Sequence, residues 1–156
     1  MDMNRQINHS KLAGELFEQG YNCAQSVLLA FEDITGLERE MAARMASSFG
    51  GGLGGLGEAC GALTGALMVL GLVAGNTDPA DKPAKELHRR RSFEYAVLFE
   101  AEHGSLRCRE LLALPEAEAG SGLTQIDKTR SKLDESPCPG LVMRAAQLLD
   151  EFLIAI

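Results

Sequence analysis

The sequence of 156 residues contains no Trp, and aromatic residues make up only 5% of it. β-branched residues are also scarce, with 5 Val, 5 Ile and 5 Thr against 23 Leu and 20 Ala. Because branched and aromatic side chains pack best on a pleated sheet, these shortages exclude an all-β fold. The apolar fraction of 46% is ordinary for a globular protein and excludes wholesale disorder. The length is that of one domain.

Basic residues are also fewer than acidic ones. The sequence has 15 Lys and Arg and 22 Asp and Glu, which gives a net charge of −7. A surface of this sign repels phosphate groups and anionic lipids, so we expect no nucleic acid and no membrane surface as a partner. The basic run at residues 89–91 lies among acidic residues and is explained as a solvated helix face. The first ten residues lack the apolar run of a secretory signal, so we expect a cytoplasmic protein.

Apolar residues recur with a helical period along almost the whole chain. We therefore predict an all-α fold over residues 1–156, a single-domain helical bundle of about six or seven helices. The predicted helices cover residues 6–19, 23–34, 38–48, 58–73, 84–102, 106–114 and 138–152. A loop with six glycines in eight positions, residues 50–57, precedes the fourth of them. In the segment from Pro115 to Glu135, the middle is the best candidate for mobile chain.

The stretch from residue 59 to residue 77 carries no charged side chain, and its length is just sufficient to cross a membrane. It contains four glycines, and its flanks lack the Lys and Arg bias that orients a membrane span. We therefore expect a buried central helix and no membrane insertion. The glycine-rich loop before it matches GxGxxG at residues 52–57, but a dinucleotide-binding fold needs a strand before that loop, and a helix is predicted there.

Four cysteines lie far apart in the sequence: Cys23, Cys60, Cys108 and Cys138. They form no Cys-x-x-Cys pair, which excludes a thioredoxin-type motif and a zinc ribbon. Each is predicted in the first turn of a helix, where unpaired N–H groups and the helix dipole favour a thiolate. Arg107 and Arg109 flank Cys108 and act in the same direction, so we expect Cys108 or Cys60 to be the most acidic thiol. The alternative is that the cysteines are small buried apolar residues.

Two further residues near the cysteines have more than one interpretation. His103 lies five residues before Cys108 and is a candidate base or ligand, or it caps the carbonyl groups at the end of its helix. Glu58 lies two residues before Cys60 and either caps the following helix or tunes that thiol.

The central helix begins with a CGAxxG motif, Cys60-Gly61-Ala62-Leu63-Thr64-Gly65, directly after the glycine-rich loop. Tyr21-Asn22-Cys23-Ala24-Gln25 precedes this motif, and the segments around Cys108 and Cys138 follow it. Over about residues 12–152 this pattern resembles the C_GCAxxG_C_C family of redox-active proteins, which is named for its four cysteines and its glycine motif. The resemblance implies a redox role and identifies no substrate.

Two redox chemistries fit four cysteines. The thiolates could ligate an iron–sulfur cluster, or they could form reversible disulfides that pass two electrons per pair. We favour the cluster as the cofactor, because a dithiol relay needs only two cysteines; tetrahedral zinc is a third option, although it carries no electrons. Gly61 and Gly65 share one helix face, and its lack of side chains admits either a cluster or a neighbouring backbone. The residues expected to border a cofactor are Gly57, Glu58, Gly61, Ala62 and Gly65.

A second class of function is a non-enzymatic helical interaction module, or a zinc-binding module, with structural cysteines. This second hypothesis is supported by the sequence, which contains no Ser-His-Asp set, no paired catalytic carboxylates and no substrate motif. The redox hypothesis requires an electron donor or acceptor, which the sequence does not identify, and we also consider a homodimer. It further predicts that the four sulfur atoms lie near one another, as two close pairs for disulfides or as one tetrahedral group for a metal.

Overall fold

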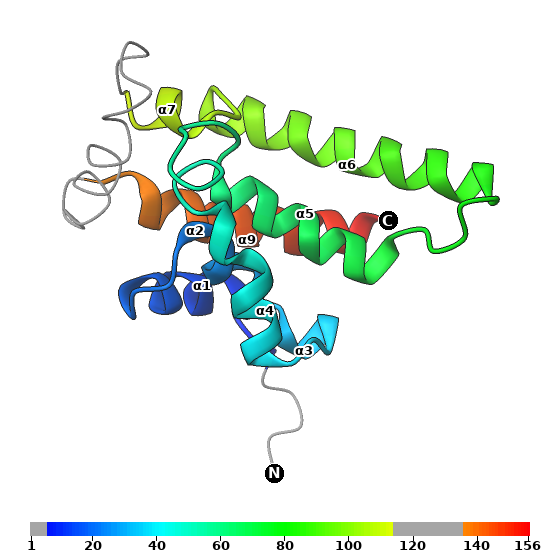
Figure 1. Cartoon of the computed structure of the whole chain (residues 1–156), viewed down its shortest axis with the longest axis horizontal. Coiled ribbons are helices and arrows are strands. Elements are labelled where there is room, and N and C mark those ends of the chain that lie inside the picture. The colour runs from blue at the N-terminus through cyan, green and yellow to red at the C-terminus, as the bar shows by residue number, and fades with distance from the viewer. Residues whose placement is uncertain (1–5, 114–135) are drawn as a thin grey trace.

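The structure is a computed structural model that describes residues 6–113 and 136–156, shown in Figure 1. Over these residues it contains eight α-helices, one 3-10 helix and no strand, so the all-α prediction is confirmed. The elements are α1 (His9–Glu18), α2 (Cys23–Ala30), α3 (Glu32–Thr35), α4 (Arg39–Ala46), η1 (Ser47–Phe49), α5 (Gly61–Ala74), α6 (Lys82–His103), α7 (Cys108–Leu111) and α9 (Cys138–Ala155). The segment predicted to contain mobile chain, from Pro115 to Glu135, lies outside the described residues.

Helix α5 lies at the centre of the fold, in contact with α2, α6 and α9, while α1 packs against α2 and α9 (Figure 1). Half of its 14 residues are buried, which agrees with the uncharged central helix predicted from the sequence. Within the two described ranges, no helix is both long enough and apolar enough to cross a membrane.

The start of α2 is fixed by local hydrogen bonds that the sequence predicts in part. Asn22 is the N-cap residue: its side chain accepts a hydrogen bond from the Gln25 amide at 2.8 Å, and the Gln25 side chain accepts one from the Asn22 amide at 3.0 Å. The Gln25 side chain also donates to the carbonyl of Ala43 at 2.8 Å, which joins α2 to α4. These bonds hold the first turn of α2, and with it Cys23, against the neighbouring helix.

The predicted helix over residues 23–34 is wrong at Phe31, where the chain leaves helical geometry and α3 begins as a separate turn. The Phe31 side chain is fully buried and stacks on the ring of His9, with 4.1 Å between the centroids. His9 in turn bonds to Asp33 at 2.9 Å and to Asp150 at 2.7 Å. Tertiary contacts of Phe31 and His9 therefore override the helical period, and this break divides the predicted helix into α2 and α3.

Helices α2 and α5 approach each other closely at two glycines of the CGAxxG motif. A methyl group on Gly65 would lie 2.6 Å from the carbonyl oxygen of Ala24, and one on Gly61 would lie 3.0 Å from the Ala24 amide nitrogen. The distance at Gly65 is too short for any side chain, and the distance at Gly61 is shorter than ordinary van der Waals contact. The backbone of α2 therefore occupies the glycine face of α5, as the close-packing interpretation predicts.

This contact predicts that Gly65→Ala destabilises the protein. The new methyl group meets backbone atoms of α2 that cannot rotate away, and overpacking of this kind costs about 1–3 kcal/mol. For a chain of this length, each kcal/mol lowers Tm by roughly 2–4 °C. Thermal unfolding followed by circular dichroism measures the effect.

Gly71→Ala is the matched control, because Gly71 lies on the same helix and a methyl group there meets no atom within 4 Å. Alanine is a better helix former than glycine by about 0.5–1 kcal/mol, so this variant should be as stable as the parent or more stable. Equal Tm values for the two variants would contradict the packing role of Gly65.

Candidate functional site

Two chain segments that are far apart in sequence pair in antiparallel fashion immediately before α5 and α7. Ala59 and Arg107 form an isolated β-bridge. On one side of it the Cys60 amide donates to the Leu106 carbonyl at 2.8 Å, and on the other the Cys108 amide donates to the Glu58 carbonyl at 2.6 Å. The pairing therefore places Cys60 opposite Leu106 and Cys108 opposite Glu58, so the two cysteines lie diagonally across the bridge although 48 residues separate them in the chain.

The glycine-rich loop, residues 50–57, folds back over this pairing. The Gly57 amide donates to the Gly51 carbonyl at 3.0 Å, and the Glu58 amide donates to the Gly52 carbonyl at 2.9 Å. Gly52 has a φ of +70°, and a methyl group there would lie 2.6 Å from the Cβ atom of Cys108. Only glycine combines this backbone conformation with so close an approach, so the loop covers Cys108 with backbone and not with side chains.

The other two cysteines also begin helices. Cys23 is the first residue of α2, and its Cβ atom would lie 3.0 Å from a methyl group on Gly61, so Cys23 neighbours the residue that follows Cys60. Cys138 is the first residue of α9, and its amide donates to the Ser136 hydroxyl at 3.2 Å. All four cysteines are 3–7% exposed and belong to one continuous buried core.

The predicted helix-end positions are confirmed, with one difference between the cysteines. Cys23, Cys108 and Cys138 are first residues of helices, and Cys60 is the N-cap residue of α5. Helix α7 is shorter than predicted, with only four residues, because its preceding residues are held extended by the pairing with residues 58–60. Its first two amides donate to the carbonyls of Glu58 and Gly57. The helix dipole therefore acts more strongly at Cys60, which begins a helix of 14 residues, than at Cys108.

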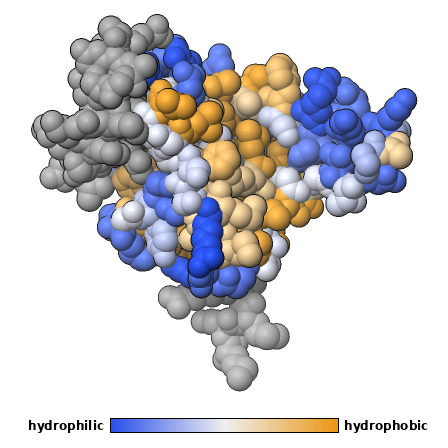
Figure 2. All heavy atoms as spheres, in the orientation of Figure 1, coloured by the Kyte–Doolittle hydropathy of each residue, from blue (hydrophilic) through white to orange (hydrophobic). Residues whose placement is uncertain are grey.

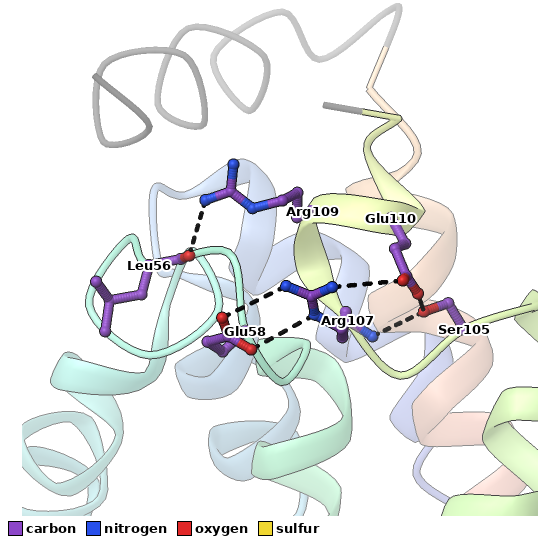
Figure 3. Close-up of polar contacts among 6 residues, drawn as sticks. All are labelled: Leu56, Glu58, Ser105, Arg107, Arg109 and Glu110. Carbon is purple, nitrogen blue, oxygen red and sulfur yellow. Dashed lines mark hydrogen bonds and ion pairs between the residues drawn. The ribbon is translucent and has the colours of Figure 1, made fainter. Parts of the chain in front are cut away.

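The arginines beside Cys108 have partners that the sequence did not indicate (Figure 3). The Arg107 guanidinium pairs with the carboxylates of Glu58 at 3.4 Å and Glu110 at 3.5 Å, which offset its charge. Arg109 is 7% exposed, and its Nη2 atom donates to the Leu56 carbonyl at 3.1 Å across the glycine-rich loop. A methyl group on Gly57 would lie 3.0 Å from the Arg109 Nε atom, so Gly57 makes room for this side chain.

Ser105 lies shortly before α7 but is not its N-cap residue. Its hydroxyl accepts a hydrogen bond from the Arg107 amide at 3.0 Å and donates to Glu110, whereas the N-cap position of α7 belongs to Arg107. Ser105 and Glu110 thereby extend the polar contacts of Arg107 on the outer side of the pairing (Figure 3).

Tyr95 is a further residue of the site, and the sequence analysis missed it. It is fully buried on α6, and its hydroxyl donates to the Ala145 carbonyl of α9 at 2.8 Å. Burial, and after it the negative charge of Cys60, raise the pKa of the Tyr95 hydroxyl well above its ordinary value of 10. Tyr95 is therefore within electrostatic range of Cys60. The helical period marks it as a core position, but it carries no signal of the cysteine beside it.

The residues expected to border a cofactor do not surround one common space. Gly61 and Gly65 face the backbone of α2, and Ala62 is fully buried. Glu58 extends outward to Arg107, and Gly57 lies against Arg109. Across residues 6–113 and 136–156, no three His, Cys, Asp or Glu side chains are grouped closely enough to hold a metal ion.

A comparison with known families identifies the class of this chain. Residues 21–152 match the model of a family described as "Putative redox-active protein (C_GCAxxG_C_C)". The match covers most of the chain, so the protein belongs to the C_GCAxxG_C_C family, and the resemblance seen in the sequence is confirmed. No curated protein and no solved structure matches the chain. The family description supports a redox role and specifies no cofactor.

His103 ends α6 with its ring against that of Phe99, at 4.5 Å between the centroids. Its Nε2 atom is buried and has no hydrogen-bond partner within the described part of the chain. Burial lowers the pKa of His103 below its ordinary value of 6.5, and this effect outweighs the attraction of the neighbouring Glu102 carboxylate. The helix end is capped by the Gly104 amide, which donates to the Glu100 carbonyl at 2.7 Å.

The lowered pKa of His103 predicts a loss of stability in mild acid. Below pH 6.5 the unfolded chain binds a proton at His103 that the folded chain binds less readily, so the free energy of unfolding falls as the pH falls. His103→Gln should reduce this fall between about pH 7 and pH 5.5. Urea unfolding at several pH values measures the free energy of unfolding as a function of pH. His88→Gln, on the same helix, is the control. An unchanged slope in His103→Gln would contradict the burial of His103.

Proposed function

We propose that this chain is a thiol–disulfide redox protein in which Cys60 and Cys108 form the reactive pair. The observation that carries the proposal is the antiparallel pairing, which holds these two cysteines on neighbouring segments through the bonds Cys60 to Leu106 and Cys108 to Glu58. The family description supports a redox role, and two neighbouring thiols are sufficient for two-electron chemistry.

Cys60 is the better attacking sulfur of the pair. It occupies the N-cap position of α5, where the first amides of a helix of 14 residues favour a thiolate. It is also the central cysteine, because Cys108 neighbours it across the pairing and Cys23 neighbours it through Gly61.

The reaction we propose is exchange with a disulfide of a partner molecule. The Cys60 thiolate attacks one sulfur of the partner disulfide and forms a mixed disulfide, which releases the other partner sulfur as a thiolate. The Cys108 thiolate then attacks Cys60, so a Cys60–Cys108 bond forms and the second partner sulfur leaves. Two electrons pass to the partner, and the two protons lost by Cys60 and Cys108 end on the partner's thiols.

Access to the pair requires movement of the glycine-rich loop. Cys60 is 3% exposed and Cys108 is 7% exposed, and Gly52 lies directly against Cys108. The exposed side chains of Leu53 and Leu56 are the part of the loop that a partner meets first. The electron partner and a cytoplasmic location are predictions that rest on the sequence.

The proposal predicts one dominant disulfide on mild oxidation. Oxidised glutathione is added to the full chain, remaining thiols are alkylated, and the protein is digested without reduction for mass spectrometry. We expect peptides joined through Cys60 and Cys108, because those segments are already paired. Cys60→Ser and Cys108→Ser should each abolish that species, and Cys138→Ser should retain it. A dominant bond between Cys23 and Cys60 would contradict the assignment of the pair.

An iron–sulfur cluster is the second candidate, and the observation in its favour is that all four cysteines lie in one buried core. Anaerobic purification followed by an absorption spectrum and iron analysis separates the two candidates. A coloured protein with bound iron that is lost on substitution of any one cysteine would favour the cluster. A colourless protein that forms the Cys60–Cys108 disulfide favours thiol–disulfide exchange.

A further inference from the structure

Helix α6 presents an apolar face to solvent. Of its 22 residues only Tyr95 and Phe99 are buried, and both point toward α5 and α9. On the remaining surface Phe93 is 65% exposed and Val97 is 49% exposed, and Leu87 and Leu98 are exposed farther round the helix. Figure 2 shows apolar surface over the middle of α6, and Figure 1 shows that its first turns project beyond the other helices. This face has no partner within the described part of the chain.

The apolar positions form a continuous stripe. Phe93 and Val97 are four residues apart, so they are neighbours on one side of the helix and make up this stripe, and Ala101 lies one turn after Val97. Exposed Phe and Val at adjacent positions on one face are typical of a surface that packs against another protein.

Charge is divided between the two halves of α6. Residues 82–92 contain five Lys or Arg and one Glu, a net charge of +4, whereas residues 93–103 contain three Glu and no Lys or Arg, a net charge of −3. Arg89 pairs with Glu86 within the first half, and Glu102 pairs with Arg144 of α9 in the second. Arg90 and Glu100 remain exposed on either side of the apolar stripe.

We propose that a second copy of this chain packs on this face, with the two α6 helices antiparallel about a two-fold axis. An axis passing near residue 95 places Phe93 beside Val97 of the second copy and Arg90 beside Glu100 of the second copy. Each such contact occurs twice because the axis exchanges the two chains. The basic half of each helix then lies against the acidic half of the other.

Charge complementarity selects the second copy over other occupants. A helix whose ends carry opposite charge is complementary to itself when it is reversed, and a parallel arrangement would place like charges together. The length of α6 is also sufficient, since 22 residues of helix extend over about 33 Å. The interface does not involve the four cysteines, so this inference is independent of the proposed function.

Sedimentation equilibrium of the full chain tests the apolar part of the interface. We expect a dimer for the parent protein and a monomer for Phe93→Glu, because the new carboxylate would be buried against Val97 of the second copy. Ile154→Glu is the matched control: Ile154 is 83% exposed on α9, so the same substitution there should leave the dimer intact. A parent protein that is monomeric at every concentration, or a dimer that survives Phe93→Glu, would overturn the proposal.

A charge exchange tests the antiparallel arrangement. Arg90→Glu and Glu100→Arg should each weaken the dimer at least about tenfold, because each places like charges together at two symmetric contacts. The double variant with both substitutions restores opposite charges at these contacts and should return Kd to within about threefold of the parent value. Single variants that weaken the dimer without recovery in the double variant would overturn the arrangement. Thermal unfolding of each variant shows that the fold is retained.

Discussion

The antiparallel pairing of residues 58–60 with residues 106–108 is the constraint on which the candidate site depends. It holds both segments extended, so α5 begins at Gly61 and α7 begins at Cys108. It also sets the ends of the glycine-rich loop, whose backbone then lies against Cys108. One short pairing therefore determines which cysteines are neighbours, which helix ends they occupy and what covers them.

Glycine serves two separate purposes on either side of this pairing. In the loop, Gly52 and Gly57 have positive φ values and admit Cys108 and Arg109, so their role is conformational as well as steric. In α5, Gly61 and Gly65 are helical, and they allow the backbone of α2 to approach. The glycines of the CGAxxG motif are thus explained by helix packing that brings Cys23 next to the start of α5.

The sequence predicted those features that are determined locally. Asn22 caps α2 through Gln25 three residues later, and such a pattern is visible without tertiary information, as is the periodic burial of α5. The pairing around Ala59 and Arg107 was not predictable, because each side contributes only a few residues and no period marks them. The helix predicted for residues 106–114 therefore began too early and continued too far. The break at Phe31 was missed because it depends on contacts with His9.

Helix α6 connects the interior site to the outer surface of the protein. Tyr95 faces inward, where its hydroxyl donates a hydrogen bond to the Ala145 carbonyl and Cys60 influences it electrostatically, while Phe93 and Val97 face solvent. Because Tyr95 is bonded to the backbone of α9, α6 cannot turn about its axis without breaking a buried hydrogen bond. This bond fixes which side of α6 faces outward. The fold thereby directs Phe93 and Val97 away from the side of α6 that carries Tyr95, so the proposed contact between two chains and the proposed exchange at Cys60 lie on opposite sides of this helix.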